Sequence, residues 1–161
     1  RFDGVKFGHR SEKHEDISEL YMKTRSEGFG DEVKKRILIG THVLSAGFYD
    51  AYYLKAQKVR RIIKNKFENT FKDVDLIFMP TTLDQAFDKN RKSTDPNRMY
   101  KEDLLTIPAN LAGLPAISFP NGFKKNLPTG GQLIGNYFAE ELLLNTTNKI
   151  QEVTDWHKMT P

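Results

Sequence analysis

The chain contains no cysteine among its 161 residues. Disulfide bonds and thiolate zinc sites are therefore excluded. Long apolar runs are also missing, since none approaches the roughly 18–20 residues that a membrane-spanning helix needs, and the sequence predicts a soluble protein without a membrane partner. Neither sign of charge dominates, because 25 basic and 21 acidic residues leave a formal net charge of only +4. This balance permits a nucleic-acid partner without indicating one.

Histidine is sparse, with 4 residues in the chain. His9 and His14 do not have the spacing of three or four residues that would place two ligands on one helix face. Gly8 and Ser11 indicate a loop around them. We therefore predict solvated histidines and no metal site.

The length suits a single domain, residues 1–161, with a sizeable core. The first residues are Arg1-Phe2-Asp3-Gly4, without an initiator methionine. We expect the chain to be a piece of a longer protein.

Apolar residues at intervals of three or four predict amphipathic helices. Asp16 is placed to cap a helix that ends near Ser26, and Gly30-Asp31 begins a second helix. A last helix is expected from Phe138 to about Trp156. The predicted inward faces carry, in chain order, Ile17, Leu20 and Tyr21; Val33, Ile37 and Leu38; Tyr52, Ala56, Val59, Ile63, Phe67 and Phe71; and Leu143, Ile150 and Val153.

Short apolar runs between these helices predict buried strands at 75–80 and 116–119. Asn121-Gly122 is expected to turn the chain, with a second strand beginning near Gln132. The polar connection 81–98 is expected to be a mobile surface loop, with a lid over a site as the alternative. Helices interrupted by short buried strands indicate the α/β class.

The long helix has a basic surface and an aromatic start. We expect a solvated face from Lys55, Lys58, Arg61 and Lys64, with contact to nucleic-acid phosphates as the alternative. The tyrosines at 49, 52 and 53 are expected in the core, rather than as a stacking platform.

The segment from Ile107 to Gly135 is punctuated by glycine and proline, which fix a backbone rather than supply a nucleophile. It contains the motifs Asn110-Leu111-Ala112-Gly113-Leu114-Pro115-Ala116-Ile117-Ser118, Pro120-x-Gly122 and Leu127-Pro128-x-Gly130-x-Gln132-x-Ile134-Gly135. In this order they resemble the closing section of amidase-signature enzymes. Two upstream motifs, residues 25–37 (RSEGFGDEVKKRI) and 49–60 (YDAYYLKAQKVR), resemble one branch of that family, the A subunits of the glutamyl-tRNA(Gln) or aspartyl-tRNA(Asn) amidotransferases.

The resemblance covers nearly the whole chain and implies the C-terminal portion of an α/β/α sandwich with a mixed central sheet. It implies part of a glutamine-hydrolysing subunit of a carbon–nitrogen ligase that forms Gln-tRNA(Gln) from Glu-tRNA(Gln) in protein biosynthesis. Its partners would be a B subunit, which uses ATP and Mg and meets the misacylated tRNA, and a small C subunit. The location would be a bacterial cytoplasm, or else an organelle. Two alternatives stay open: another amidase-signature amide hydrolase, or a non-catalytic binding or assembly module.

Two charged residues gain a role from the resemblance. From the residues alone, Arg36 is a snorkelling or salt-bridging side chain, and Asp103 is capping or solvated. The resemblance implies that Arg36 binds the α-carboxylate of glutamine and that Asp103 receives its α-amino group. Such a pair selects amino acids over plain amides.

The family's catalytic serines and lysine have no match here, so we expect no catalytic residue in this chain, no cofactor of its own, and no activity from it alone. Ser118 is not a substitute, because it is expected inside a buried strand. One position departs from the resemblance: Gly131 stands where related sequences usually carry a large apolar residue, which predicts a weakened strand or a bulge.

Overall fold

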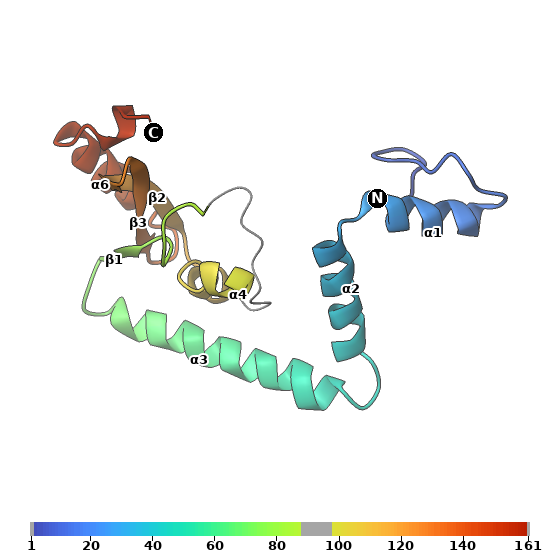
Figure 1. Ribbon diagram of the computed structural model, residues 1–161. Coiled ribbons are helices and arrows are strands. Elements are labelled where there is room, and N and C mark those ends of the chain that lie inside the picture. The colour runs from blue at the N-terminus through green and yellow to red at the C-terminus, as the bar shows by residue number, and fades with distance from the viewer. Residues whose placement is uncertain (1, 88–97, 161) are drawn as a thin grey trace. The chain divides into compact units, whose positions relative to one another are not determined.

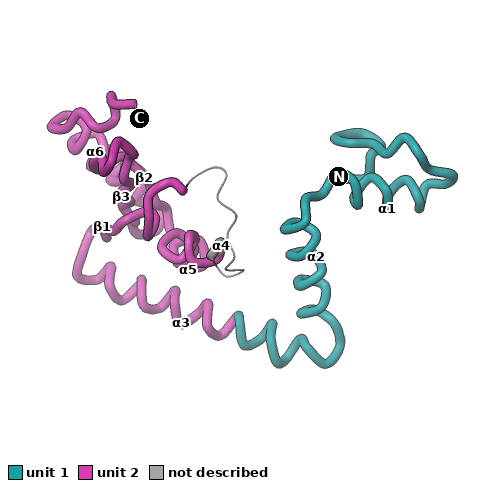
Figure 2. Tube along the Cα trace, in the orientation of Figure 1, with its two compact units in different colours: residues 1–56 teal, residues 57–161 magenta. Residues whose placement is uncertain are grey.

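The computed structural model describes residues 2–87 and 98–160 (Figure 1). It divides into two compact units, residues 1–56 and 57–161 (Figure 2). That residues 1–161 belong to a single domain stays a prediction.

The first unit is built on helix α1 (Ile17–Gly28), which begins where the sequence predicts. The Asp16 carboxylate caps it by accepting a hydrogen bond from the Glu19 backbone N–H at 2.7 Å. An irregular N-terminal segment is tied to this helix, because the backbone N–H of buried Ser11 donates to the Thr24 hydroxyl at 3.1 Å. Leu20 is the buried apolar residue of the helix, as expected.

Helix α2 (Asp31–Val43) also begins as predicted, with Gly30 at its N-cap. Its expected inward residues, Val33, Ile37 and Leu38, are exposed, and Leu38 is 70% exposed. The expectation that they form a core is therefore wrong for this chain, because no described segment covers that face. A π-helical stretch, η1 (Tyr49–Leu54), follows.

The tyrosines of η1 were expected in the core, and this is wrong for two of them. Tyr49 and Tyr52 are exposed, and Tyr53 is half-buried. The rings of Tyr49 and Tyr53 stack on each other with centroids 4.8 Å apart. The rings of Tyr49 and Tyr53 therefore pack against each other.

Helix α3 (Lys55–Thr70) confirms the long helix predicted from its apolar stripe. Ile63, Phe67 and Phe71 are half-buried, whereas Val59 is exposed. The stripe is thus partly covered towards the end of the helix and open at its beginning.

The second unit contains a three-stranded sheet in the order β1-β3-β2. The strands are β1 (Leu76–Pro80), β2 (Ala116–Lys124) and β3 (Leu127–Gly135), and both pairings are antiparallel. Short helices α4 (Arg98–Glu102) and α5 (Ile107–Ala112) lie between β1 and β2 in sequence, and α6 (Glu140–Glu152) with the 3₁₀ turn η2 (Trp156–Lys158) follows β3. The α/β class is confirmed, and no parallel pairing occurs between the described strands, so the mixed sheet is not seen here.

The predicted turn at Asn121-Gly122 is wrong. Strand β2 continues to Lys124, and the hairpin turns at Lys125 and Asn126, whose φ angles are +51° and +63°. A two-residue turn with positive φ at both positions matches the right-handed twist of the strands. Gly122, with φ +149°, instead follows a register shift within β2.

The glycine at position 131 is explained by an aromatic neighbour. A Cβ atom on Gly131 would lie 2.7 Å from Cε2 of Phe78, so the Phe78 ring occupies that space. Strand β3 stays paired to both neighbours there, and the irregularity lies on β2, between Pro120 and Gly122. The bulge expected from Gly131 is therefore on the opposite strand.

The core of the second unit lies between the sheet and α6. Phe119, Leu133 and Leu143 are buried together, with Ile150 packed against them. The inward positions predicted for Leu143 and Ile150 are confirmed. Val153 is 82% exposed, because α6 ends at Glu152, before the predicted boundary near Trp156.

Candidate functional site

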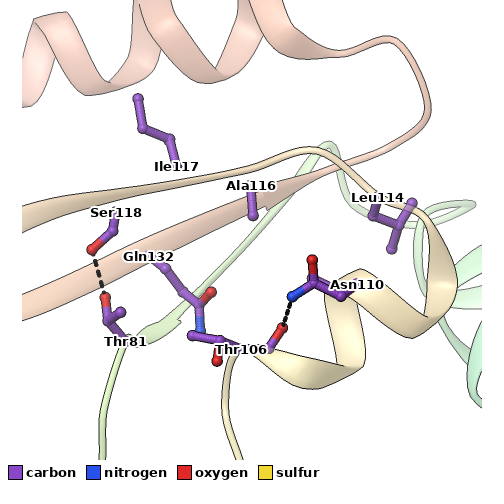
Figure 3. A pocket seen from close by; sticks show the side chains of 9 residues that line it. Thr81, Thr106, Asn110, Leu114, Ala116, Ile117, Ser118 and Gln132 are labelled. Carbon is purple, nitrogen blue, oxygen red and sulfur yellow. Dashed lines mark hydrogen bonds between the residues drawn. The ribbon is translucent and has the colours of Figure 1, made fainter. Parts of the chain in front are cut away.

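A pocket of about 370 Å³ lies on the face of the sheet that carries Gln132 and Ser118 (Figure 3). Residues alternate across a strand, so this face is opposite to the one where Leu133 packs on α6. The pocket is lined by the residue after β1, the beginning of β2, helix α5 and the middle of β3: Thr81, Thr106, Ala109, Asn110, Leu114, Ala116, Ile117, Ser118 and Gln132. All of these belong to the second unit.

Gln132 is a buried polar side chain of this pocket, with 4% of its surface exposed. Its amide nitrogen donates to the backbone oxygens of Pro80 at 3.1 Å and Leu105 at 2.9 Å. These two acceptors fix the orientation of the carboxamide, because only its nitrogen can donate. The side chain therefore joins three segments: the end of β1, the entrance of α5, and β3.

Two hydroxyl groups meet beside Gln132, because Ser118 is its partner on strand β2 (Figure 3). The oxygens of Thr81 and Ser118 lie 2.9 Å apart, within hydrogen-bonding distance (Figure 3). Ser118 is exposed, so the expectation that it is buried is wrong: strand β2 packs Phe119 inward and turns Ser118 to the pocket. Within the described residues, its hydroxyl contacts another hydroxyl and no histidine, lysine or carboxylate that could act as a general base.

Helix α5 forms the third wall, and its ends are set by local sequence. Pro108 stands in its first turn, and Gly113 follows its end with φ +76°, a left-handed conformation that favours glycine. The Asn110 side chain donates to the Thr106 backbone oxygen at 3.0 Å. The short helix is thus bounded by a proline at its start and a glycine just after its end.

Asp103 lies in the turn between α4 and α5. Its backbone oxygen accepts hydrogen bonds from the N–H groups of Thr106 at 3.1 Å and Ile107 at 3.0 Å. Its side chain is half-buried, and within residues 2–87 and 98–160 no hydrogen bond or ion pair engages the carboxylate. This carboxylate is available to an incoming cationic group, although Asp103 is not among the residues that line the pocket.

Arg36 lies on the exposed surface of α2, in the first unit. Its Nε donates to a carboxylate oxygen of Glu32, one helical turn earlier, at 2.9 Å. Arg36 and Asp103 belong to different units, and their pairing around one ligand stays a prediction.

Two basic side chains of α3, Arg60 and Lys64, make contacts within the second unit. Arg60 Nε donates to the Leu111 backbone oxygen at 2.8 Å, which ties α3 to the end of α5. Lys64 Nζ lies 5.3 Å from the centre of the Tyr137 ring and 3.6 Å from a Glu68 oxygen. Of the four residues expected in a solvated face, Lys64 thus contacts neighbouring side chains, and contact of this face with RNA stays a prediction.

The perturbed carboxyl groups belong to surface interactions. The pKa of Glu27 is lowered, first by a hydrogen bond from His9 and next by one from the Ser11 hydroxyl. The pKa of Asp3 is lowered chiefly by the Val5 backbone N–H, and those of Glu19 and Asp155 chiefly by Lys23 and Lys158. Each shift reflects a local donor, the pattern of a structural contact rather than of an acid or base in a cleft.

No cluster of three metal-ligating side chains occurs in the described ranges, 2–87 and 98–160. His9 contacts Glu27, and Nδ1 of His14 lies 3.0 Å from the Ser11 backbone oxygen. None of the helices within these ranges is long and apolar enough to cross a membrane.

Sequence reasoning missed the role of Gln132. A signal was present, because a polar side chain stands directly before Leu133 and Ile134 in a strand that is otherwise small or apolar. A buried polar group of this kind must find hydrogen-bond partners. The partners themselves are backbone oxygens of distant segments, which no local pattern identifies.

The family model described as Amidase matches residues 1–144. Curated relatives that carry the name of the A subunit of glutamyl-tRNA(Gln) amidotransferase are 60% identical in Hahella chejuensis and 58% identical in Coxiella burnetii, over all 161 residues. The chain spans 33% of the length of each of these relatives.

Solved structures show the same relationship. The A subunit of the glutamyl-tRNA(Gln) amidotransferase of Thermotoga maritima is 45% identical, with a TM-score of 0.58 over 79% of this chain and 29% of that one. The allophanate hydrolase of Kluyveromyces lactis is 28% identical, with a TM-score of 0.54 over 79% of this chain and 21% of that one. Both matches cover 79% of this chain. The chain belongs to the amidase family.

Proposed function

We propose that this chain is part of the glutamine-hydrolysing A subunit of an amidotransferase that forms Gln-tRNA(Gln) from Glu-tRNA(Gln). The observation that carries the proposal is identity of 58–60% along all 161 residues to relatives with that subunit's name. Since the chain spans 33% of their length, the activity belongs to a longer protein.

The substrate bound by this part would be glutamine, held by its two α-charges. Arg36 would hold the α-carboxylate, because a planar guanidinium can donate two parallel hydrogen bonds to it. Asp103 would receive the α-ammonium group. The Asp103 carboxylate has no ion pair with the described residues, which supports this role, since a new partner would displace none of them. The Glu32 contact of Arg36 spans one turn of an exposed helix and would be weak enough to yield.

The catalytic serines and lysine would lie outside this chain. Within the described residues, the two pocket hydroxyls of Thr81 and Ser118 meet each other and lack an activating base. The chain would thus supply a substrate-binding wall, and the remainder of the protein would supply the nucleophile.

The proposal extends to partners. A B subunit would use ATP and Mg to activate the glutamyl group, would receive the ammonia that glutamine hydrolysis releases, and would meet most of the misacylated tRNA. A small C subunit would hold the other two together. The compartment would be the bacterial cytoplasm, with an organelle as the alternative.

A different amide hydrolase is the second candidate, because the structural relatives include an allophanate hydrolase at 28% identity. The two candidates differ in what the site must recognise. An enzyme for plain amides has no use for a pair of groups that binds both charges of an amino acid.

The test is glutamine kinetics of the full-length protein in its complex, with Arg36→Ala, Asp103→Asn and a control, Arg61→Ala on α3. Loss of one charge-assisted hydrogen bond costs about 1.5–3 kcal/mol, so we expect KM for glutamine to rise about tenfold or more in the first two variants and to stay unchanged in the control. An unchanged KM for glutamine in both the Arg36 and the Asp103 variant would show that neither residue binds glutamine. If the folded wild-type complex does not hydrolyse glutamine, the second candidate, a hydrolase of another amide, is favoured.

A further inference from the structure

We propose that Gln132 is a positioning residue for Asp103, and that it holds the segment carrying this carboxylate against the sheet. The inference rests on the proposed function, in which Asp103 receives the α-ammonium group of glutamine.

The Gln132 side chain links the central strand to two other segments. Gln132 lies on the central strand β3, paired with Met79 on one side and Ser118 on the other, and is almost fully buried. Its amide nitrogen carries two protons, and both have acceptors, the backbone oxygens of Pro80 and Leu105. The side chain therefore acts as a fixed link from the central strand of the sheet to the turn before α5.

Leu105 and Asp103 belong to the same hydrogen-bonded turn. The backbone oxygen of Asp103 accepts from Thr106 N and Ile107 N, so residues 103–107 form one closed turn. The Thr106 hydroxyl adds a third contact to the same oxygen, at 3.3 Å. Because Leu105 sits in the middle of this turn, a shift of its carbonyl group moves Asp103 with it.

Few contacts other than its own backbone fix the Asp103 carboxylate. The Asp103 side chain has no hydrogen bond or ion pair with the described part of the chain, and helix α4 before it has five residues. Its position is therefore inherited from its backbone. A charge-assisted hydrogen bond to an ammonium group needs a short donor–acceptor distance, so a small displacement weakens it.

The structure supplies a matched control in Gln85. Its amide nitrogen also donates to two backbone oxygens, those of Lys124 at 2.6 Å and Leu127 at 2.9 Å. These acceptors flank the hairpin turn between β2 and β3, rather than the Asp103 turn. Gln85→Met and Gln132→Met thus each remove two hydrogen bonds from a side-chain amide to backbone oxygens, and only the second substitution frees the Asp103 turn.

The experiment compares two substrates in the assembled full-length amidotransferase: glutamine, and glutaramate, which is glutamine without its α-amino group. We expect Gln132→Met to reduce the preference for glutamine over glutaramate, as a ratio of kcat/KM, about tenfold, with glutaramate turnover nearly unchanged. Gln85→Met keeps the wild-type ratio. Gln132→Asn, which retains an amide donor on a shorter side chain, gives an intermediate ratio.

Formation of Gln-tRNA with ammonium in place of glutamine reports that each variant is folded and assembled. If Gln132→Met fails this control, Gln132→Asn decides, and an unchanged ratio in it overturns the proposal. An equal loss on both substrates also overturns it, because that is the effect of a purely structural residue.

Asp103→Asn separates this inference from the function on which it depends. If Asp103→Asn keeps the preference for glutamine, the proposed function fails. If Asp103→Asn loses the preference and Gln132→Met keeps it, only the positioning role is overturned.

Discussion

Glu27 accepts two hydrogen bonds that join the N-terminal segment to α1. They come from His9 at 2.7 Å and from the Ser11 hydroxyl at 2.9 Å, and the His9 contact is the larger cause of the lowered pKa. A carboxyl group with a lowered pKa in the folded state stabilises that state only while it is ionised. The contact is therefore a pH-dependent tie between two segments of the first unit.

The sign of this dependence follows from the pKa shift. The stabilisation by Glu27 is present above its ordinary pKa of 4.5 and is lost as the pH falls through the lowered, folded-state value. We expect Glu27→Gln to lower Tm of the full-length protein near neutral pH, and the difference from wild type to shrink below pH 4.5. Thermal unfolding across this pH range measures it. A difference that does not change with pH would contradict the role of the charge.

Gln132 also shows where prediction from sequence ends at the residue scale. Its position in the family motif is visible in the chain, but its two acceptors lie at Pro80 and Leu105, which are far from it in sequence. Arg36 and Asp103 were assigned through the resemblance, and their roles remain predictions. A buried polar residue can be recognised as one that needs partners, while the partners come only from the fold.

At the scale of single elements, replacing glycine by alanine at two helix positions should change the free energy of unfolding in opposite directions. Gly113 ends α5 in a left-handed conformation, so Gly113→Ala is expected to destabilise the full-length protein by about 1 kcal/mol. Gly40 lies inside α2 with open space where a Cβ would be, so Gly40→Ala is expected to stabilise it by about 0.5–1 kcal/mol.

Denaturant unfolding of both variants measures these changes. Neither glycine would place a Cβ within 4 Å of another described group, so no steric contact with the described residues enters the comparison. Equal effects in the two variants would contradict the assignment of their backbone conformations.

Helix starts were predictable because their signals are local, as at Asp16 and Gly30. The β-hairpin was not predictable in the same way. Asn121-Gly122 is a strong turn signal, yet Asn121 accepts a hydrogen bond from the Thr129 hydroxyl at 2.9 Å within the paired strands. The turn falls at Lys125-Asn126 because pairing along two nine-residue strands outweighs one favourable dipeptide.

At the scale of the whole molecule, burial was the least predictable property. Apolar side chains on α2 were expected in a core and are exposed, as are Phe78 and Phe138 in the second unit. Periodicity identifies which face of a helix is apolar, but what covers that face depends on other segments. The relatives are about three times as long as this chain, so their remaining segments are not represented here.

Because the chain is about a third as long as its relatives, it is expected to lack their activity on its own. We expect the isolated 161-residue chain to hydrolyse no glutamine under conditions in which the full-length protein does, because the family's catalytic serines and lysine have no match in it and, within the described residues, the pocket hydroxyls of Thr81 and Ser118 hydrogen-bond each other rather than a base. Ammonia release measured on both preparations is the test. Robust turnover by the isolated chain would mean that a nucleophile lies within it, and Ser118→Ala and Thr81→Ala would then locate it.

The sheet order β1-β3-β2 gives the second unit two unlike rims. On the β2 rim, Pro120 has no N–H to offer and the register shifts beside it, which interrupts the row of backbone groups. On the β1 rim, Leu76 to Met79 present an unbroken row before Pro80 ends the strand. Of the two edges of the described sheet, the β1 edge is therefore the better suited to pair with a further strand from the rest of the protein.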